Sequence, residues 1–553
     1  MSLINRVVLS IVAFFGLAFL VGCGNNGAPA PTPPPSGGFS KSDLKGTYVF
    51  STAGSDPNGA FFTMAGTLQA DGNGGIAGGT IDINDSDPIL NPPVQAFGQS
   101  ISSNSSYTVS VDGRGQIFLT NTPLGTISFD FVLSSSSGGL ITEFDGNGTG
   151  SGTLDLQSST ITQAQMAQGY VVSLSGVDSN TNFLSGAGAF TLAADGTVAS
   201  GTGVNDFNES QIVLAGGALN GNVTLAAGGG SGTAQLSTAV GSLSFNFYVI
   251  DANHLKFIET DALPQAVLSG DAFKQAAIPT GTLVFTMSGE TNSGGIAVPL
   301  AAGGFMTSTA AGQTTNGLED ANLNGTISSV QVPFTLNYSA TVNGRSTLAL
   351  TGFAGGPTSL AIYPFSDGST NGMLMLEIDS NALMAGTAFL QSSTSLAAPP
   401  QGYGLNLTGV NIGTTSPFEL DDIAEFATAT SGSTTTLKGL LDENDEGTLQ
   451  NPQAITAANS ALSLDSPATG RGAAFFASSS TAGLFNIVFY TVDGTNTLFL
   501  EEDNTQIAVG VFQMQSSGSA KSSSSAIRSL ATRPMVLSHG GFSHPGGAAI
   551  RRK

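Results

Sequence analysis

The sequence of 553 residues has one cysteine, no tryptophan and few charged residues, which make up 10% of the chain. A single cysteine excludes an intramolecular disulfide bond and a cluster of thiolate metal ligands. The lack of tryptophan, with only 8 tyrosines, weakens the case for a carbohydrate-binding site, because such sites rely on aromatic platforms.

Basic residues are scarce as well, with 15 Lys and Arg against 38 Asp and Glu. All 38 acidic residues lie between Cys23 and Gln515, where only eight residues are basic, so this part of the chain carries a net charge of about −30. Nucleic-acid binding depends on Lys and Arg side chains that neutralise phosphates. We therefore exclude nucleic acid as a partner.

The residues after Gln515 have the opposite charge. Residues 516–553 contain six basic side chains and no acidic one, and they are rich in Ser and Gly. This composition predicts a disordered basic tail. Two interpretations stay open: the tail has no specific role, or it contacts an anionic membrane or lipopolysaccharide through Arg551, Arg552 and Lys553.

The N-terminus has the parts of a secretory signal. Arg6 precedes an apolar run over residues 7–21, which is shorter than the roughly 20 residues that a membrane-spanning helix needs. The run ends in Leu20-Val21-Gly22-Cys23, which resembles the lipobox of bacterial lipoproteins, whose cysteine thiol is alkylated. The resemblance implies a signal peptide over residues 1–22 and a lipid, such as palmitate, on Cys23. An unlipidated signal or a membrane anchor is the alternative.

The residues after the lipobox bear on localisation. Gly24 stands where lipoproteins retained at the inner membrane often have Asp, so the resemblance implies a lipid-anchored protein of the cell envelope at the outer membrane. The Pro-rich run at 28–35 favours an extended polyproline II conformation. We interpret residues 23–40 as the lipidated cysteine and a linker that holds the folded part away from the membrane.

Four segments of the chain open alike, with a glycine, an aromatic or apolar residue close behind it, and then a second glycine. These glycine pairs are Gly46 and Gly54, Gly169 and Gly176, Gly281 and Gly289, and Gly402 and Gly409. The openings lie 123, 112 and 121 residues apart, and the segments close at Gln157, Gln275, Gln391 and Gln515. The recurrence predicts four tandem domains, over residues 41–160, 161–276, 277–395 and 396–515.

The local pattern inside each repeat is that of β-strands. Residues alternate between apolar and polar from Leu243 to Phe247, and pairs such as Asp71-Gly72 supply the positive φ of tight hairpins. We therefore predict an all-β fold of four tandem antiparallel β domains, each a small up-and-down barrel or a sandwich of roughly six to eight strands. A repeat of about 115 residues can bury its own core, so we expect the repeats to fold independently.

The repeats also resemble known groups of proteins. The Gly-x-Tyr opening at Gly46 to Tyr48 and the hairpin order are loosely similar to lipocalin-type and avidin-type barrels, which start with a Gly-x-aromatic strand. Over nearly the whole chain, the repeats resemble the Gly-rich tandem-repeat surface lipoproteins of environmental bacteria. That resemblance implies a surface protein, and the function of the group is unassigned.

Two polar signatures occur once in every repeat. The first is Gly-x-x-Asp-x-Asn, with the polar residues Asp82 and Asn84, Asp206 and Asn208, Asp320 and Asn322, and Asp442 and Asn444. The second is Glu-x-Asp after an apolar run, at Glu143 and Asp145, Glu259 and Asp261, Glu377 and Asp379, and Glu501 and Asp503. Four matches to each signature, in the same order, indicate a shared role.

Residues i and i+2 of a strand share a face, so each Glu-x-Asp presents two carboxylates side by side. Calcium takes roughly six to eight oxygen ligands, and the two signatures of one repeat would supply four if they met on neighbouring strands. The alternative is that Asp-x-Asn caps a turn and that Glu-x-Asp is a solvated strand end. Calcium is the one cofactor that these residues indicate.

Paired acids also serve glycosidases, but catalytic pairs come from separate elements, and four copies of one active site in a chain would be unusual. The sequence has no Gly-x-Ser-x-Gly motif, and we expect His254 at the surface or in a turn. We therefore predict a non-enzymatic surface protein with a binding or structural role. The alternative is an envelope hydrolase or a small-ligand or carbohydrate-binding protein. The expected partners are the membrane, through the lipid, and an unknown surface ligand.

Overall fold

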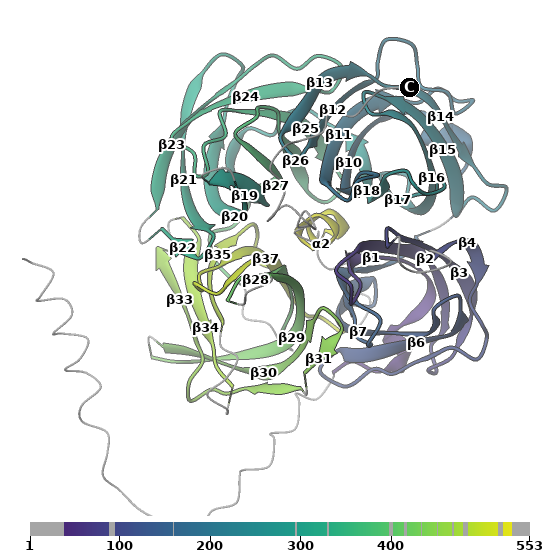
Figure 1. The fold of residues 1–553 in the computed structure, drawn as a ribbon. Helices are drawn as coiled ribbons and strands as arrows, with labels where there is room; N and C mark the ends of the chain where they lie inside the picture. Colours follow the sequence, from purple (N-terminus) through teal and green to yellow (C-terminus); the bar gives the residue numbers. More distant parts are fainter. Residues whose placement is uncertain are drawn as a thin grey trace, which may run out of the picture. The chain divides into compact units, whose positions relative to one another are not determined.

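Antiparallel β-strands make up most of the protein in its computed structural model (Figure 1). The structure describes residues 38–87, 94–158, 160–293, 296–328, 331–396, 402–413, 417–432, 434–450, 452–466, 469–478, 485–517 and 524–532. The signal peptide, Cys23 and most of the linker lie outside the described residues. Within the described residues, no helix is long and apolar enough to cross a membrane.

The first two sets of strands are called barrel 1 and barrel 2. Barrel 1 follows the short 3-10 helix η1 (Lys41–Asp43) and consists of β1 (Lys45–Ser55), β2 (Phe61–Asp71), β3 (Ile76–Asp85), β4 (Gln95–Ser100), β5 (Ser106–Tyr107), β6 (Arg114–Thr122), β7 (Gly125–Ser135), β8 (Gly138–Glu143) and β9 (Thr149–Leu156). Barrel 2 follows η2 (Gln163–Met166) and consists of β10 (Gly169–Val177), β11 (Phe183–Thr191), β12 (Val204–Glu209), β13 (Ile212–Ala218), β14 (Asn220–Leu225), β15 (Ser231–Thr238), β16 (Gly241–Asp251), β17 (His254–Glu259) and β18 (Val267–Gln275).

The next two sets are called barrel 3 and barrel 4. Barrel 3 consists of β19 (Gly281–Ser293), β20 (Ile296–Ser308), β21 (Thr314–Leu323), β22 (Thr326–Ile327), β23 (Val332–Tyr338), β24 (Ser346–Thr351), β25 (Ser359–Ser366), β26 (Asn371–Glu377) and β27 (Ala382–Leu390). Barrel 4 consists of β28 (Tyr403–Asn411), β29 (Phe418–Ser431), β30 (Thr434–Asp445), β31 (Thr448–Leu449), β32 (Gln453–Ile455), β33 (Ala461–Ser466), β34 (Arg471–Phe476), β35 (Phe485–Thr491), β36 (Asn496–Glu501) and β37 (Gln506–Met514). The helix α2 (Ser525–Ala531) follows barrel 4.

Each barrel is closed by the antiparallel pairing of its first strand with its last. β1 pairs with β9, β10 with β18, β19 with β27, and β28 with β37. In barrels 3 and 4, the strand pairings complete the circle, whereas in barrels 1 and 2 separate backbone bonds replace one pairing, such as Tyr107 N–H to Gly74 O. The predicted fold class of tandem antiparallel β domains is confirmed, and of the two alternatives the barrel is observed.

The second glycine of each repeat opening lies where the first strand passes the last strand of the same barrel. A Cβ atom on Gly54 would lie 2.0 Å from the backbone oxygen of Thr149, and one on Gly289 would lie 1.9 Å from that of Leu383. These distances are far shorter than a van der Waals contact, so only glycine fits there. This close approach explains why the glycine recurs in every repeat.

Apolar side chains fill the barrel interiors. Leu243, Phe245 and Phe247 alternate along β16 and all join the core of barrel 2, as the period-two pattern predicts. In barrel 4, the rings of Phe476 and Phe485 stack with centroids 4.6 Å apart. The barrels therefore hold packed cores built mainly from aromatic and aliphatic residues.

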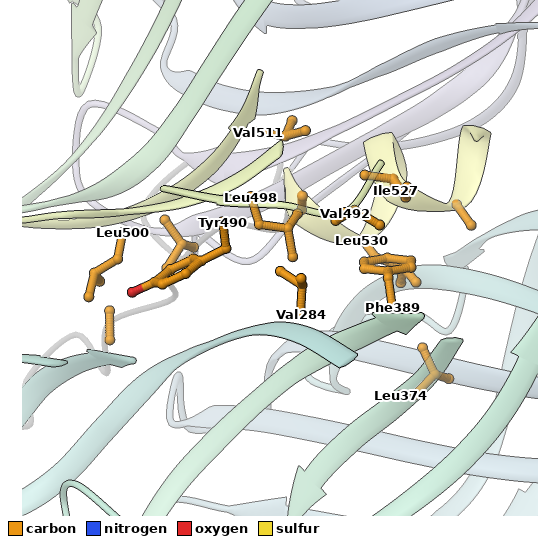
Figure 2. Packing of buried hydrophobic residues seen from close by; sticks show 14 of the residues in the cluster. Val284, Leu374, Phe389, Tyr490, Val492, Leu498, Leu500, Val511, Ile527 and Leu530 are labelled. Atoms are coloured by element: carbon orange, nitrogen blue, oxygen red, sulfur yellow. The ribbon is translucent and has the colours of Figure 1, made fainter. Parts of the chain in front are cut away.

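The strands that face neighbouring barrels are apolar on their outer side too. These outer faces form one cluster, the central core, to which all four barrels and α2 contribute. Figure 2 shows the part of it where side chains of barrels 3 and 4 and of α2 pack together. Its fully buried members include Val132, Phe273, Phe389, Val511 and Ile527. Size alone led us to expect independent repeats, but these apolar faces would be exposed to water in an isolated repeat.

Helix α2 corrects the prediction for the C-terminal tail. It lies within residues 516–553, and each of its residues from Ala526 to Ala531 is buried. The prediction of disorder was wrong for this stretch because Ile527 and Leu530 lie at helical spacing and pack on the central core. The hydroxyl of Ser524 caps the helix by accepting a hydrogen bond from the Ile527 N–H at 3.2 Å. Residues 518–523 and 533–553 lie outside the described residues.

Candidate functional site

The asparagine of the first signature forms a hydrogen bond with the next barrel. Its side-chain nitrogen donates to the backbone oxygen of a second-signature glutamate, and the pairs are Asn84 to Glu259 at 2.8 Å, Asn208 to Glu377 at 3.2 Å, Asn322 to Glu501 at 3.3 Å and Asn444 to Glu143 at 2.7 Å. The first three pairs join consecutive barrels. The fourth pair joins barrel 4 to barrel 1, so the four interfaces form a closed cycle.

The aspartate of the first signature is held by side chains of the next barrel. Asp206 in barrel 2 accepts from Arg345 Nε at 2.6 Å, from Arg345 Nη2 at 2.9 Å and from the Tyr363 hydroxyl at 2.5 Å, both residues being in barrel 3. The matching set between barrels 3 and 4 is Asp320, Arg471 and Tyr490. Burial and the carboxylate of Asp206 raise the pKa of Tyr363 well above its usual value. Each set is a buried, bidentate ion pair with a third donor.

The other two aspartates have different partners. Asp82 accepts from the Tyr248 hydroxyl and from Asn246 Nδ2 in barrel 2, both at 2.8 Å. Asp442 in barrel 4 pairs with Arg114 Nη1 of barrel 1 at the longer distance of 3.3 Å. Burial raises the pKa of Asp442, and the charge of Arg114 opposes that shift. The interface that closes the cycle therefore has a weaker ion pair than the interfaces before and after barrel 3.

The aspartate of the second signature bonds within its own barrel. Asp145 Oδ2 accepts from the Ser128 N–H at 2.8 Å, which fastens the turn after β8 to the neighbouring strand. The glutamate side chains are buried, with 0% exposure for Glu259 and Glu377. Burial raises the pKa of each of these two carboxyls to about 9. They are therefore neutral acids near pH 7.

The two signatures meet across neighbouring barrels, not within one repeat. In barrel 1, the side chain of Asn84 lies on the outer face and contacts Glu259 of barrel 2. The side chain of Glu143 lies on the inner face with the core residue Ile141, so the two signature residues of barrel 1 are on opposite faces. Among the described residues, no group of three or more His, Cys, Asp or Glu side chains has the arrangement of a metal site. Calcium binding by the signature residues stays a prediction.

The alternative roles of the signatures, turn capping by Asp-x-Asn and a solvated strand end for Glu-x-Asp, are observed in part. In three barrels, the asparagine Oδ1 accepts from a backbone N–H three residues later, the donors being Gln211, Gly325 and Gly447. The expected solvent exposure of the second signature is wrong for its glutamates, because Glu143, Glu259, Glu377 and Glu501 are at most 1% exposed. Their strand positions explain this burial, since Glu143, for example, shares the inner face of barrel 1 with the core residue Ile141.

The glutamines that close the repeats also contact the following barrel. Gln157 Nε2 donates to the backbone oxygen of Val249 in barrel 2 at 2.6 Å, and Gln391 Nε2 donates to that of Thr491 in barrel 4 at 2.8 Å. Gln515, at the end of barrel 4, donates to the backbone oxygen of Leu133 in barrel 1 at 3.0 Å. These bonds follow the same order as those of the first signature. The repeat pattern marks these glutamines only as repeat ends, because their acceptors lie in other repeats and leave no local pattern.

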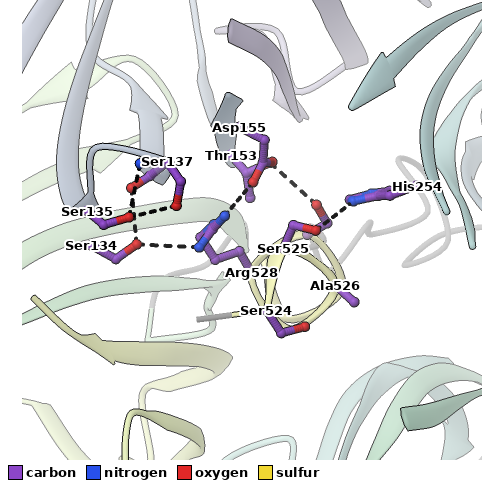
Figure 3. Close-up of polar contacts among 12 residues, drawn as sticks. Ser134, Ser135, Ser137, Thr153, Asp155, His254, Ser524, Ser525, Ala526 and Arg528 are labelled. Atoms are coloured by element: carbon purple, nitrogen blue, oxygen red, sulfur yellow. Dashed lines mark hydrogen bonds and ion pairs between the residues drawn. The ribbon is translucent and has the colours of Figure 1, made fainter. Parts of the chain in front are cut away.

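Helix α2 forms polar contacts with three barrels, and Figure 3 shows those with barrels 1 and 2. Arg528 Nη2 bonds to Asp155 of barrel 1 at 2.6 Å, and the Ser525 hydroxyl lies 3.0 Å from His254 Nδ1 of barrel 2. The Ser524 hydroxyl donates to Asp367 of barrel 3. With the apolar contacts of the central core to barrel 4, α2 touches every barrel.

His254 corrects a further expectation. We expected it at the surface or in a turn, but it is 0% exposed, and its Nε2 lies 2.8 Å from Asp271 Oδ1. Ser525, His254 and Asp271 follow the order of a hydrolytic triad, yet Lys256 Nζ also bonds to Asp271 at 3.2 Å. Because His254 is enclosed and its partner serine lies on α2, we interpret this network as the attachment of α2 to barrel 2.

Comparisons with known proteins give distant structural likeness. No protein-family model matches the chain, and no curated protein matches it. Similar solved structures include transferrin binding protein B from serogroup B Neisseria meningitidis, with 9% identity, coverage of 66% of this chain and 79% of that chain, and a TM-score of 0.20. Intact Ap-TbpB with N and C lobes has 9% identity over 88% of this chain and 98% of that chain, with a TM-score of 0.17.

A third solved structure is a protein of unknown function from the DUF3598 family of Nostoc punctiforme PCC 73102. It has 10% identity over 42% of this chain and 94% of that chain, with a TM-score of 0.14. TM-scores this low support no statement about the function of this chain. The function is therefore argued from its own residues.

Proposed function

We propose that this chain is a lipid-anchored protein of the cell envelope, held at the outer membrane through Cys23, whose four barrels act as one body that binds a surface partner. The main support is the use of the recurring polar residues. They join one barrel to the next instead of gathering at an open reactive site. This use favours a binding or structural role over catalysis.

Two physical features support a binding role. Barrels that are held together keep their exposed loops at fixed separations. Binding of a partner to several loops at once therefore costs little conformational entropy, because the loops are already in place. The acidic charge of about −30 between Cys23 and Gln515 favours a partner with a basic surface. The Pro-rich linker would hold this body away from the membrane.

The anchor is tested by the Cys23→Ala variant. We expect the variant to lose metabolic labelling by palmitate and to leave the membrane fraction, because no other cysteine is present to take the lipid. Radiolabelling and cell fractionation measure both effects. Gly24→Ala is the matched control and should keep the label.

The same unlipidated variant tests the binding role on arrays of proteins and glycans. Saturable binding to one partner would support the proposal. Turnover of an arrayed substrate would instead favour the envelope hydrolase. Palmitate labelling that persists in Cys23→Ala would contradict the lipid anchor.

A further inference from the structure

Barrel 1 contains a cavity of about 240 Å³ at the end of its core. One side of the cavity is apolar and consists of Phe62, Ile83 and Leu124. The other side carries the carboxyl groups of Asp56, Asp85 and Glu143. The volume is below the range of roughly 300–1,000 Å³ that holds drug-sized ligands, so an occupant must be small.

The carboxyl group of Glu143 has an unmet hydrogen-bonding capacity in this cavity. Glu143 is 1% exposed, and its Oε2 is buried with no hydrogen-bond partner. The bond from Asn444 that joins barrels 4 and 1 uses the backbone oxygen of Glu143, and the carboxyl group contacts Asp145 of its own barrel, so neither contact supplies a donor to Oε2. A buried acceptor without a donor destabilises a fold, and a ligand N–H would relieve that cost.

The matching glutamates of barrels 2 and 3 differ from Glu143. In barrel 2, Glu259 accepts from the Asp261 N–H and from Asn84. In barrel 3, Glu377 accepts from the Ala382 N–H at 3.0 Å. Each of these two carboxyls therefore has at least one donor from the protein itself, although Glu377 Oε2, like Glu143 Oε2, is buried without a hydrogen-bond partner.

The electrostatics of the cavity favour a cation. Its lining residues include no Lys or Arg among those the structure describes. Burial raises the pKa of Asp85 to about 7, and the charges of Asp56 and Asp87 add to the shift. The charge of Asp56 also helps to raise the pKa of Glu446 in the neighbouring barrel 4, so a further acid lies near this end of barrel 1. A positive charge placed here would lower the energy of all these groups.

We propose that this cavity binds a small organic ammonium ion, with the charged nitrogen at Glu143 and the apolar part against Phe62, Ile83 and Leu124. The apolar wall favours an organic cation over a bare metal ion, as does the absence of a metal-type cluster among the described residues. This site goes beyond the proposed surface role and is independent of the lipid anchor.

Titration calorimetry tests the proposal on the whole chain with Cys23→Ala in a non-ionic detergent at pH 7.5. The probes are cyclohexylammonium and cyclohexanol, which share the apolar ring and differ in charge. We expect a dissociation constant of about 1 mM or tighter for the ammonium and binding at least about 10-fold weaker for the alcohol. Failure of the ammonium to bind, or equal binding of the alcohol, would overturn the proposal.

Burial raises the pKa of Glu143 well above its usual value, so the carboxyl becomes charged only when a bound cation draws off its proton. The variant Glu143→Gln should weaken ammonium binding at least about 10-fold, because an amide keeps the shape but has no proton to release to balance the ammonium charge. Glu377→Gln in barrel 3 is the matched control and should bind like the parent. If Glu143→Gln does not fold by circular dichroism, Asp85→Asn replaces it with the same expected direction. Unchanged binding in the folded cavity variant would contradict the site. Competition by calcium chloride at lower concentration than the ammonium would overturn the ammonium assignment in favour of a metal.

Discussion

Truncation of the chain after Ser517 is expected to lower the free energy of unfolding by about 5 kcal/mol or more. The truncation removes Ile527 and Leu530 from the central core, where they are 0% and 5% exposed. It also leaves Asp155, which is 0% exposed, without the guanidinium of Arg528. An apolar void and an unpaired buried charge are among the most destabilising changes a protein can suffer.

Urea unfolding followed by tyrosine fluorescence measures this effect. Truncation after Thr532 is the matched control, because it keeps α2 and all its contacts, and it should unfold like the parent. The single variant Arg528→Met separates the ion pair from the apolar contacts and should account for about 3 kcal/mol of the loss. Equal unfolding midpoints for the two truncations would show that α2 does not hold the barrels together.

The second large effect is stabilisation by acid. Several buried carboxyls at the contact between barrels 4 and 1 have raised pKa values. Burial and the nearby charge of Asp442 raise the pKa of Asp130 to about 7, and burial and the charge of Asp112 raise that of Glu425 to about 8. Burial raises the pKa of Glu446 to about 7. Arg114 is the basic residue near Asp130 and Glu425, and its charge opposes both of those shifts.

A carboxyl whose pKa is higher in the folded state binds its proton more tightly there, so protonation favours the fold. The stability from these groups is complete below about pH 4 and is lost as the pH rises through 7 to 8. Groups with lowered pKa values, such as Asp178, act in the opposite direction at more acidic pH. We therefore expect the melting temperature to rise by roughly 5 °C or more from pH 8 to pH 5.5.

Differential scanning calorimetry across this range measures the profile. The double variant Asp130→Asn and Glu425→Gln mimics the protonated forms and should reduce the slope of the profile, with the largest gain in stability at pH 8; buried carboxyls elsewhere, such as Glu259 and Glu377, keep part of the slope. Asp71→Asn, in an exposed turn, is the control and should keep the parental slope. A melting temperature that is constant or falls on acidification would contradict the assignment of these carboxyls to the closing interface.

The fold class could be predicted from local patterns. Alternation such as that of Leu243 to Phe247 and the recurring glycine pairs reflect the geometry of a single barrel, which each repeat carries in its own sequence. The same patterns do not reveal the outer faces. β17 shows why: all six of its residues are buried, including His254 and Lys256, which a period-two pattern places on the face exposed to water.

The partners of the signatures could not be predicted because they are far apart in the sequence. Asn84 and Glu259 are separated by 175 residues, Asn208 and Glu377 by 169, and Asn322 and Glu501 by 179. The near-constant separation is itself a signal, since it equals about one and a half repeats in each case. It would have identified the three consecutive interfaces, though not the return from Asn444 to Glu143. Helix α2 was missed because seven residues in a Ser-rich tail carry almost no pattern.

The closed cycle of barrels is tested most directly by the distance between barrels 1 and 4. Because Cys23 is the only cysteine, a Cys23→Ala background allows spin labels at two introduced cysteines, Asn147→Cys and Leu449→Cys. Both positions are exposed. Asn147 precedes Gly148 in barrel 1, and Leu449 pairs with Asn444 in barrel 4. Asn444 Nδ2 donates to the backbone oxygen of Gly148 at 2.8 Å, so the two labelled positions lie close together. Pulsed electron paramagnetic resonance should give one short, narrow distance distribution. A broad distribution extending to long distances would show that barrels 1 and 4 do not meet, and would contradict the cycle.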